Sequence, residues 1–170
     1  MKAANAVTLA RILAIPLFVF ALFLPLPGRD WIAAAVFAAL ALTDTVDGWL
    51  ARKLNQKSAF GALLDPVADK LLVSAALVFL IGRGVPVWMA YVIIARELLI
   101  TGLRLAVVKD VVVAASWLGK LKTLSQVIAI LAVLVLPIAA YWLLLLATIL
   151  TVVSGVDYLL AMWKHIKEEL

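Results

Sequence analysis

The stretch Asp44-Thr-Val-Asp-Gly-Trp-Leu-Ala-Arg52, continued by Gly61-Ala-Leu-Leu-Asp-Pro-Val-Ala-Asp69, places four aspartates within 26 residues of a strongly apolar chain. A carboxylate at or near a membrane is costly unless a partner compensates its charge, and a divalent cation is the simplest partner. Read as helices, the first two aspartates are three residues apart and the last two are four apart, so each pair lies on one face of its own helix. Two such faces would form an all-oxygen pocket, which suits Mg²⁺ or Mn²⁺ rather than softer metals.

The composition indicates a helical integral membrane protein. Of the 170 residues, 67% are hydrophobic and 15% are charged, and the mean hydropathy is +1.18, whereas a soluble domain carries about 25% charged residues. The sequence has no alternating β-barrel pattern, so its spans are expected to be helices. It has no cysteine, which excludes disulfides and thiolate metal ligands. The net charge of +5 comes from basic residues at the ends of apolar segments, which indicates topology and anionic headgroups rather than nucleic acid as a partner.

Apolar segments separated by turn signals predict six membrane-spanning helices in a single domain covering residues 1–170. A short N-terminal segment is expected to lie at the membrane interface or to open the first span. The first span resembles a signal peptide in having a basic residue before an apolar run, but no small-x-small cleavage site follows it, so we expect it to be retained. The uncharged run 124–156 is too long for one crossing, which takes about 20 residues, so Pro137 is expected to mark a tight reversal. The predicted spans cover residues 7–26, 31–53, 60–81, 87–108, 118–136 and 138–162.

The basic residues predict the orientation of these spans. With six spans both termini share one side of the membrane. Of the 15 Lys and Arg residues, twelve fall on that side, two (Arg29 and Arg83) fall on the other, and Arg96 lies within the fourth span. This positive-inside distribution places both termini and the aspartates at the cytoplasmic face of the inner membrane of the cell.

The full pattern Asp44-x2-Asp47-Gly48-x2-Ala51-Arg52-x8-Gly61-x3-Asp65-x3-Asp69 resembles, at every fixed position, the signature of the CDP-alcohol phosphotransferase family. The resemblance implies a six-span fold, usually a homodimer, that moves a phosphatidyl or related group from a CDP-linked donor to an alcohol. The donor's pyrophosphate is anionic, so Asp44, Asp47 and Asp65 would hold a metal that stabilises its charge. By similarity to the family, Asp69 would share the metal site and act as the general base that takes the acceptor's hydroxyl proton.

Small residues beside the aspartates are expected to admit the nucleotide. They share helix faces with the aspartates and allow close approach to the backbone, and the resemblance places the CDP moiety there too. Arg52 would reach a phosphate or extend to the interface. Asn5 and Thr8 share a helix face with Arg11. These residues could contact the CDP-linked donor or could simply lie at the membrane interface. The nucleotide-binding candidates are Asn5, Thr8, Asp47, Gly48, Ala51, Arg52, Gly61 and Asp65.

Three further segments resemble the bacterial phosphatidylglycerophosphate synthases of that family. They are Asn5-x2-Thr8-x2-Arg11, Ala95-Arg-Glu-Leu-Leu-Ile-Thr-Gly-Leu-Arg104 and Ser116-x2-Gly-Lys120-x-Lys122-Thr123-x2-Gln126. The resemblance implies CDP-diacylglycerol as donor and sn-glycerol 3-phosphate as acceptor, with CMP and phosphatidylglycerol phosphate as products. Because this acceptor is itself a phosphate, a cationic clamp is required beside the aspartates. The candidates are Arg104, Lys120, Lys122, Thr123 and, in second rank, Arg96.

Other interpretations stay open. Lys120 and Lys122 would also serve as membrane-anchoring charges. Glu97 is expected to pair with another helix, because it is adjacent to Arg96 and the two side chains start on different faces. The acceptor of the same chemistry could be inositol phosphate, serine or another alcohol. A divalent-cation transporter is a different class, disfavoured because transport sites usually lie near the bilayer midplane between broken helices, and a structural membrane subunit would tolerate the loss of Asp69.

Overall fold

Six helices and no strand make up the part of the chain that the structure describes, which confirms the all-α class. The computed structural model describes the backbone of residues 3–53, 59–107 and 117–168, and the side chains of residues 10, 12–43, 67, 70–104 and 117–163. The helices are α1 (Ala3–Leu22), α2 (Arg29–Lys53), α3 (Ala59–Phe79), α4 (Val87–Val107), α5 (Trp117–Val135) and α6 (Pro137–Glu168).

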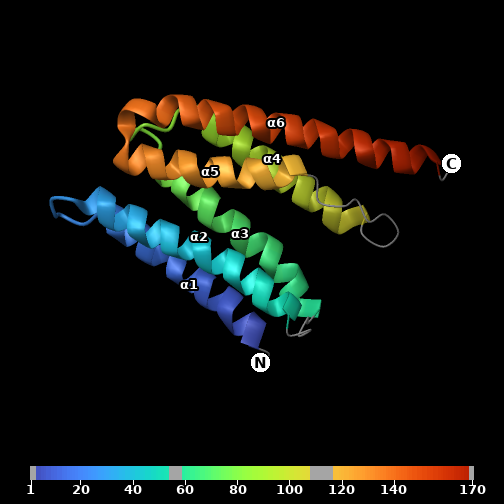
Figure 1. The fold of residues 1–170 in the computed structure, drawn as a ribbon, viewed down its shortest axis with the longest axis horizontal. Helices are drawn as coiled ribbons and strands as arrows, with labels where there is room; N and C mark the ends of the chain where they lie inside the picture. The colour runs from blue at the N-terminus through green and yellow to red at the C-terminus, as the bar shows by residue number, and fades with distance from the viewer. Residues whose placement is uncertain (1–2, 54–58, 108–116, 169–170) are drawn as a thin grey trace.

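The helices form two groups of three (Figure 1). Helix α1 packs against α2 and α3, and α6 packs against α4 and α5. The groups meet where α2 contacts α5 and where α3 contacts α4 and α5. The α1–α2, α3–α4 and α5–α6 turns gather at one end of the bundle, and both termini lie toward the other end, with the end of α2 and the start of α3 (Figure 1).

The predicted glycine and proline turns are present after the first and third helices. α1 ends at Leu22, four residues before the predicted limit, because the residue before Pro25 is pushed out of the helical region of backbone conformation. Gly28 has a φ of 81°, and Gly82 and Gly84 have φ values of 80° and 118°. These left-handed conformations favour glycine, which has no Cβ to clash with the backbone.

The expected tight reversal at Pro137 is confirmed. α5 ends at Val135 and α6 begins at Pro137, so a single residue, Leu136, separates them. Proline suits the first position of a helix because its missing N–H would have no partner there and its φ is already helical.

The N-terminal segment is continuous with the first helix. α1 begins at Ala3 and runs unbroken to Leu22, although Pro16 lies inside it. Of the two interpretations of this segment, the structure therefore favours the one in which it opens the first helix rather than forming a separate interfacial element.

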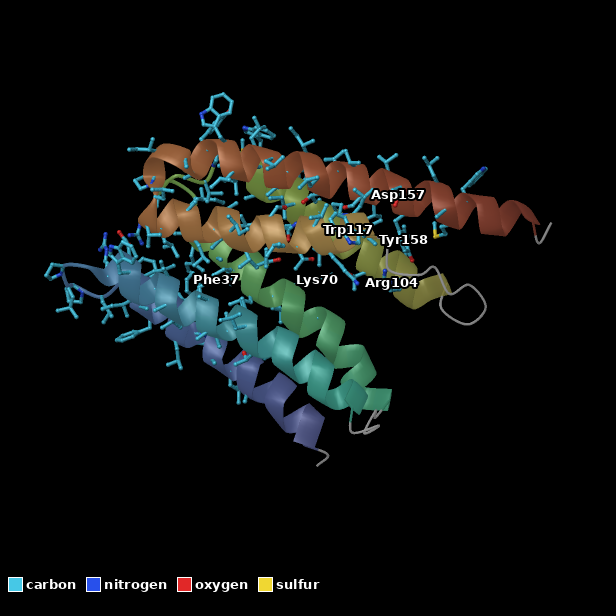
Figure 2. All side chains as sticks on the ribbon, in the orientation of Figure 1. Phe37, Lys70, Arg104, Trp117, Asp157 and Tyr158 are labelled. Carbon is cyan, nitrogen blue, oxygen red and sulfur yellow. The ribbon has the colours of Figure 1, made fainter. Side chains whose placement is uncertain are left out.

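The core lies between tightly packed helices. Phe18 of α1 and Phe37 of α2 are fully buried with ring centroids 5.5 Å apart. Phe37 is labelled in Figure 2. Fully buried alanines on four helices let the backbones approach closely, as small residues do in helical membrane proteins. These alanines are Ala33, Ala76, Ala129 and Ala147.

An ion pair joins three elements at the turn end of the bundle. Arg83, in the α3–α4 turn, donates from Nη2 to Asp30 Oδ1 of α2 over 2.6 Å and from Nη1 to the Leu22 carbonyl of α1 over 3.2 Å. This arginine therefore holds the end of α1 and the start of α2 against the turn between α3 and α4.

Two helices of the described chain are long and apolar enough to cross a membrane, namely Trp117–Val135 and Pro137–Trp163. Shorter apolar helical stretches cover Ile12–Leu22 and Lys70–Phe79. Large apolar side chains also face outward, among them Ile138, which is 92% exposed, and Tyr91, which is 72% exposed.

Candidate active site

The four aspartates lie on two consecutive helices that pack against each other. Asp44 and Asp47 are in the last part of α2, and Asp65 and Asp69 are in the first half of α3. The end of α2 and the start of α3 lie at the same end of the bundle (Figure 1). The side chains of all four fall outside the described residues, so their convergence on a metal stays a prediction that this arrangement of helices permits.

The nucleotide-binding candidates also fall at this end. Gly48, Ala51 and Arg52 are in α2, Gly61 is in α3, and Asn5 and Thr8 are near the start of α1. Their side chains lie outside the described part of the chain. The backbone nevertheless brings the three segments together, because α1 packs against both α2 and α3 and its first turns lie toward that end of the bundle (Figure 1).

Among the residues whose side chains are described, no group of three or more His, Cys, Asp or Glu is placed to hold a metal. The candidate metal ligands are the α2–α3 aspartates that the sequence pattern indicates, and their side chains lie outside that set. Their donor set consists of carboxylate oxygens alone, which fits a hard divalent cation such as Mg²⁺ or Mn²⁺.

A buried ionic cluster centred on Glu97 lies between α3, α4, α5 and α6. Glu97 is only 4% exposed. Its Oε1 atom accepts from Lys122 Nζ of α5 over 2.5 Å, from Gln126 Nε2 over 3.3 Å and from Arg96 Nη1 over 3.4 Å. Its Oε2 atom lies 4.0 Å from Lys70 Nζ of α3. One carboxylate thus contacts cations from three helices.

Helix α6 completes this cluster with hydroxyl groups. Gln126 Nε2 donates to Thr151 Oγ1 over 2.9 Å, and Arg96 Nη2 donates to Ser154 Oγ over 3.0 Å. Both hydroxyls donate in turn to carbonyls of their own helix. Among the buried side-chain nitrogen and oxygen atoms of the described residues, only Arg96 Nε has no hydrogen-bond partner.

The electrostatics explain why these groups stay together. Moving a carboxylate and a cation out of water costs several kcal/mol per ion, and their attraction offsets this only when the geometry is good and the remaining polar atoms are bonded. Lys122 and Arg96 both pair with Glu97, which is their only ion-pair partner in the described part of the chain. The expectation that Glu97 pairs with another helix is confirmed by its bonds to α5.

The structure separates the predicted acceptor clamp into two sets. Lys122 is buried beside Glu97, whereas Lys120 is exposed, because residues two apart lie on nearly opposite sides of a helix. Thr123 Oγ1 donates to the Gly119 carbonyl of its own helix over 3.2 Å. Arg96 joins Lys122 in the Glu97 cluster.

The remaining clamp candidate, Arg104, contacts an aromatic ring. Its guanidinium carbon lies 5.4 Å from the centroid of the Tyr158 ring of α6, a cation–π distance (Figure 2). Arg104 stands seven residues after Glu97 on α4, so the two share a helix face.

Sequence reasoning assigned no role to the residues that α6 contributes. Thr151, Ser154 and Tyr158 recur at intervals of three and four residues in α6, which has no charged residue before Asp157. That spacing puts hydroxyl-bearing side chains on one face and would have indicated a polar contact inside the bundle. Gln126 stands four residues after Lys122 and follows the same rule.

The sequence is similar to those of known proteins. The sequence model of the CDP-alcohol phosphatidyltransferase family matches residues 1–153. The chain is 43% identical to the CDP-diacylglycerol–glycerol-3-phosphate 3-phosphatidyltransferase of Bacillus subtilis, with 96% of each chain covered. It is 43% identical to a probable phosphatidylglycerophosphate synthase of Mycobacterium tuberculosis, covering 91% of this chain and 78% of the relative. It is 41% identical to the CDP-diacylglycerol–glycerol-3-phosphate 3-phosphatidyltransferase of Yersinia enterocolitica, covering 95% and 94%.

Proposed function

The chain belongs to the CDP-alcohol phosphatidyltransferase family, and from this premise we propose that it transfers the phosphatidyl group of CDP-diacylglycerol to sn-glycerol 3-phosphate. The products are phosphatidylglycerol phosphate and CMP. The observation that carries this proposal is the similarity, over almost the whole chain, to relatives that are named for this reaction.

The reaction exchanges one phosphorus–oxygen bond for another. The free primary hydroxyl of glycerol 3-phosphate attacks the phosphorus on the diacylglycerol side of the donor. The bond from that phosphorus to the CMP phosphate breaks, and CMP leaves with the electron pair. Asp69 takes the proton from the attacking hydroxyl as general base, a role that contributes about 10²–10⁴-fold to the rate.

The aspartates of α2 and α3 are the residues that would hold Mg²⁺ or Mn²⁺. Asp44, Asp47 and Asp65 would bind the ion, and Asp69 would share the site as the general base for the acceptor. A bound divalent cation supplies charge neutralisation on the donor's pyrophosphate. The small residues Gly48, Ala51 and Gly61 leave room for the cytidine nucleotide against the helix backbones, with Arg52, Asn5 and Thr8 beside it.

The acceptor's phosphate is bound by cations near the centre of the bundle. Arg96, which is partly buried, and Lys122, which is buried, are supported in this role because both pair with Glu97, whose other oxygen lies near Lys70 of α3, the helix of Asp69. Arg104 lies on the same face of α4 as Glu97 and would be the third cation that binds this phosphate. Lys120 is exposed and the Thr123 hydroxyl donates to the Gly119 carbonyl, so their contact with the acceptor needs a direct test.

We place the enzyme in the inner membrane as a single six-span domain with the aspartates and both termini on the cytoplasmic side. Support comes from the six helices, from the two that are long and apolar enough to cross, and from large apolar side chains that face outward, which a soluble monomer rarely exposes in quantity. The family usually assembles as a homodimer, and we propose the same state here.

Purified protein in detergent, supplied with labelled CDP-diacylglycerol, Mg²⁺ and a panel of acceptors, tests the function. We expect CMP release and phosphatidylglycerol phosphate with glycerol 3-phosphate, and little product with serine or inositol phosphate. Product from another alcohol alone would keep the chemistry and overturn the acceptor. No CMP release with any acceptor would overturn the transferase itself.

A further inference from the structure

Glu97 is a buried carboxylate that the proposed reaction does not use. It is adjacent in sequence to Arg96 and reaches, on its other sides, Lys122 of α5 and Lys70 of α3. Lys70 directly follows Asp69, the proposed general base, in the chain. Glu97 therefore links the helix of the base to two cations proposed to bind the acceptor.

Stability alone is a weak reason for such a cluster. Replacing a buried ion pair by well-packed apolar residues is often neutral or stabilising, so charge buried at this cost calls for a function. The surroundings on α4, α5 and α6 are otherwise apolar, with Ile93, Ile130 and Ala147 fully buried in the same core. Larger apolar side chains would close this part of the bundle equally well.

The cations around Glu97 still have donors to offer. A lysine ammonium has three N–H donors, and within the described residues Lys122 donates to Glu97 alone. The Arg96 Nε–H, also buried, has no partner there. Glu97 therefore holds both cations in place while it leaves N–H groups for a second anion. A phosphate, with its several acceptor oxygens, suits such a set of charged donors.

We infer that Glu97 is a positioning residue for the acceptor: by bonding to Lys122 and Arg96 it fixes the cations that bind the phosphate of glycerol 3-phosphate. This inference rests on the proposed function. Without the carboxylate, the two cations repel each other across a buried space and lose their common anchor, so the donors move away from the phosphate. The donor lipid, bound through the aspartates of α2 and α3, is unaffected.

Glu97→Gln tests this, because it keeps the shape and removes the charge. In purified enzyme we expect the KM for glycerol 3-phosphate to rise about ten- to a hundredfold, the penalty of misplacing binding groups by about an ångström. The KM for CDP-diacylglycerol stays within about twofold. Glu97→Asp keeps the charge and is expected to recover part of the acceptor KM. Thr148→Val is the matched control, since Thr148 is buried on α6 and, within the described part of the chain, its hydroxyl bonds only to the Leu144 carbonyl of its own helix.

A rise in the KM for glycerol 3-phosphate without a rise in the KM for CDP-diacylglycerol distinguishes positioning of the acceptor from general support of the fold. An unchanged acceptor KM in Glu97→Gln, or an equal rise in both KM values, would overturn the inference. If Glu97→Gln cannot be purified, Glu97→Asp decides in the same way: a rise in the acceptor KM alone supports positioning, and no rise overturns it. A wild-type protein that makes no phosphatidylglycerol phosphate would refute the proposed function and this inference with it, whereas an active wild type with an unaffected variant refutes the inference only.

Discussion

Lys122 Nζ lies 2.5 Å from Glu97 Oε1, and this buried bond joins α5 to α4. The lysine side chain is 7% exposed and the glutamate side chain 5%. The same carboxylate lies 4.0 Å from Lys70, next to Asp69. The proposed acceptor cations and the helix of the proposed base are therefore parts of one packed unit.

Lys122→Met is expected to damage both stability and acceptor binding. Removing one partner of a buried ion pair leaves the other charge poorly compensated, which costs about 3–5 kcal/mol, and Arg96 and Gln126 will recover part of that. We expect a lower temperature of unfolding in detergent and a higher KM for glycerol 3-phosphate.

Lys120→Met provides the matched comparison two residues away. Lys120 is exposed, and an exposed charge contributes about 1 kcal/mol or less to stability. We expect an unfolding temperature close to the wild-type value and a small change in acceptor KM. An equal rise in acceptor KM for Lys120→Met and Lys122→Met would indicate that Lys120 also binds the acceptor's phosphate.

Asp69→Asn is expected to lower turnover by about 10²–10⁴-fold, the contribution of a general base, with normal expression and membrane insertion. Asp157→Asn makes the same chemical change at an exposed position on α6 and should leave turnover unchanged. Labelled CMP release under saturating substrates is the measurement. Wild-type turnover in Asp69→Asn would assign proton removal to another group.

Removal of divalent cations is expected to abolish turnover reversibly. Dialysis against EDTA should stop CMP release, and Mg²⁺ or Mn²⁺ should restore it, because a set of carboxylate oxygens binds hard cations. In Asp44→Asn or Asp65→Asn, half-maximal activity should require a higher metal concentration. Full activity in EDTA would contradict the metal assignment of these aspartates.

Arg83→Met is expected to weaken the fold slightly without altering the kinetics. Arg83 bonds to Asp30 and to the Leu22 carbonyl, at the end of the bundle opposite the aspartates (Figure 1). Because the Asp30 side chain is 44% exposed, solvent screening limits the stabilisation from this ion pair to about 1 kcal/mol or less. A fall in the unfolding temperature with both KM values unchanged is the expected outcome, and a changed KM would indicate coupling between the two ends.

The sequence predicted the number and order of the helices because their limits depend on local chemistry. The apolar runs break at Pro25 and at Gly82, where the backbone cannot continue as a helix or needs a left-handed glycine. The run 124–156 is too long for one crossing and contains Pro137, which indicates the third reversal. The four aspartates were recognisable for a similar reason, since their spacing along two helices is visible without any knowledge of packing.

The Glu97 cluster could be predicted only in part, because it depends on the rotation of four helices about their axes. The adjacency of Arg96 and Glu97 showed that the glutamate needed a partner elsewhere, but the sequence did not say whether α3, α5 or α6 would supply it. For the same reason Lys120 and Lys122 were grouped by proximity in sequence, whereas the fold places one outside and the other inside. Thr151 and Ser154 were overlooked as single hydroxyls in an apolar run.

Gly155→Ala tests how closely the acceptor cations are held. A Cβ atom at Gly155 would lie 3.2 Å from both Cγ and Nε of Arg96, closer than ordinary van der Waals contact. The arginine must therefore shift, although its bonds to Ser154 and Glu97 restrain it. We expect a severalfold rise in the KM for glycerol 3-phosphate, with the KM for CDP-diacylglycerol unchanged.

Gly102→Ala is the control, since a Cβ there meets nothing within 4 Å, and alanine is a better helix former than glycine. If both variants keep the wild-type acceptor KM, Arg96 does not have to be held in place for the phosphate to bind, and the clamp reduces to Lys122 and Arg104.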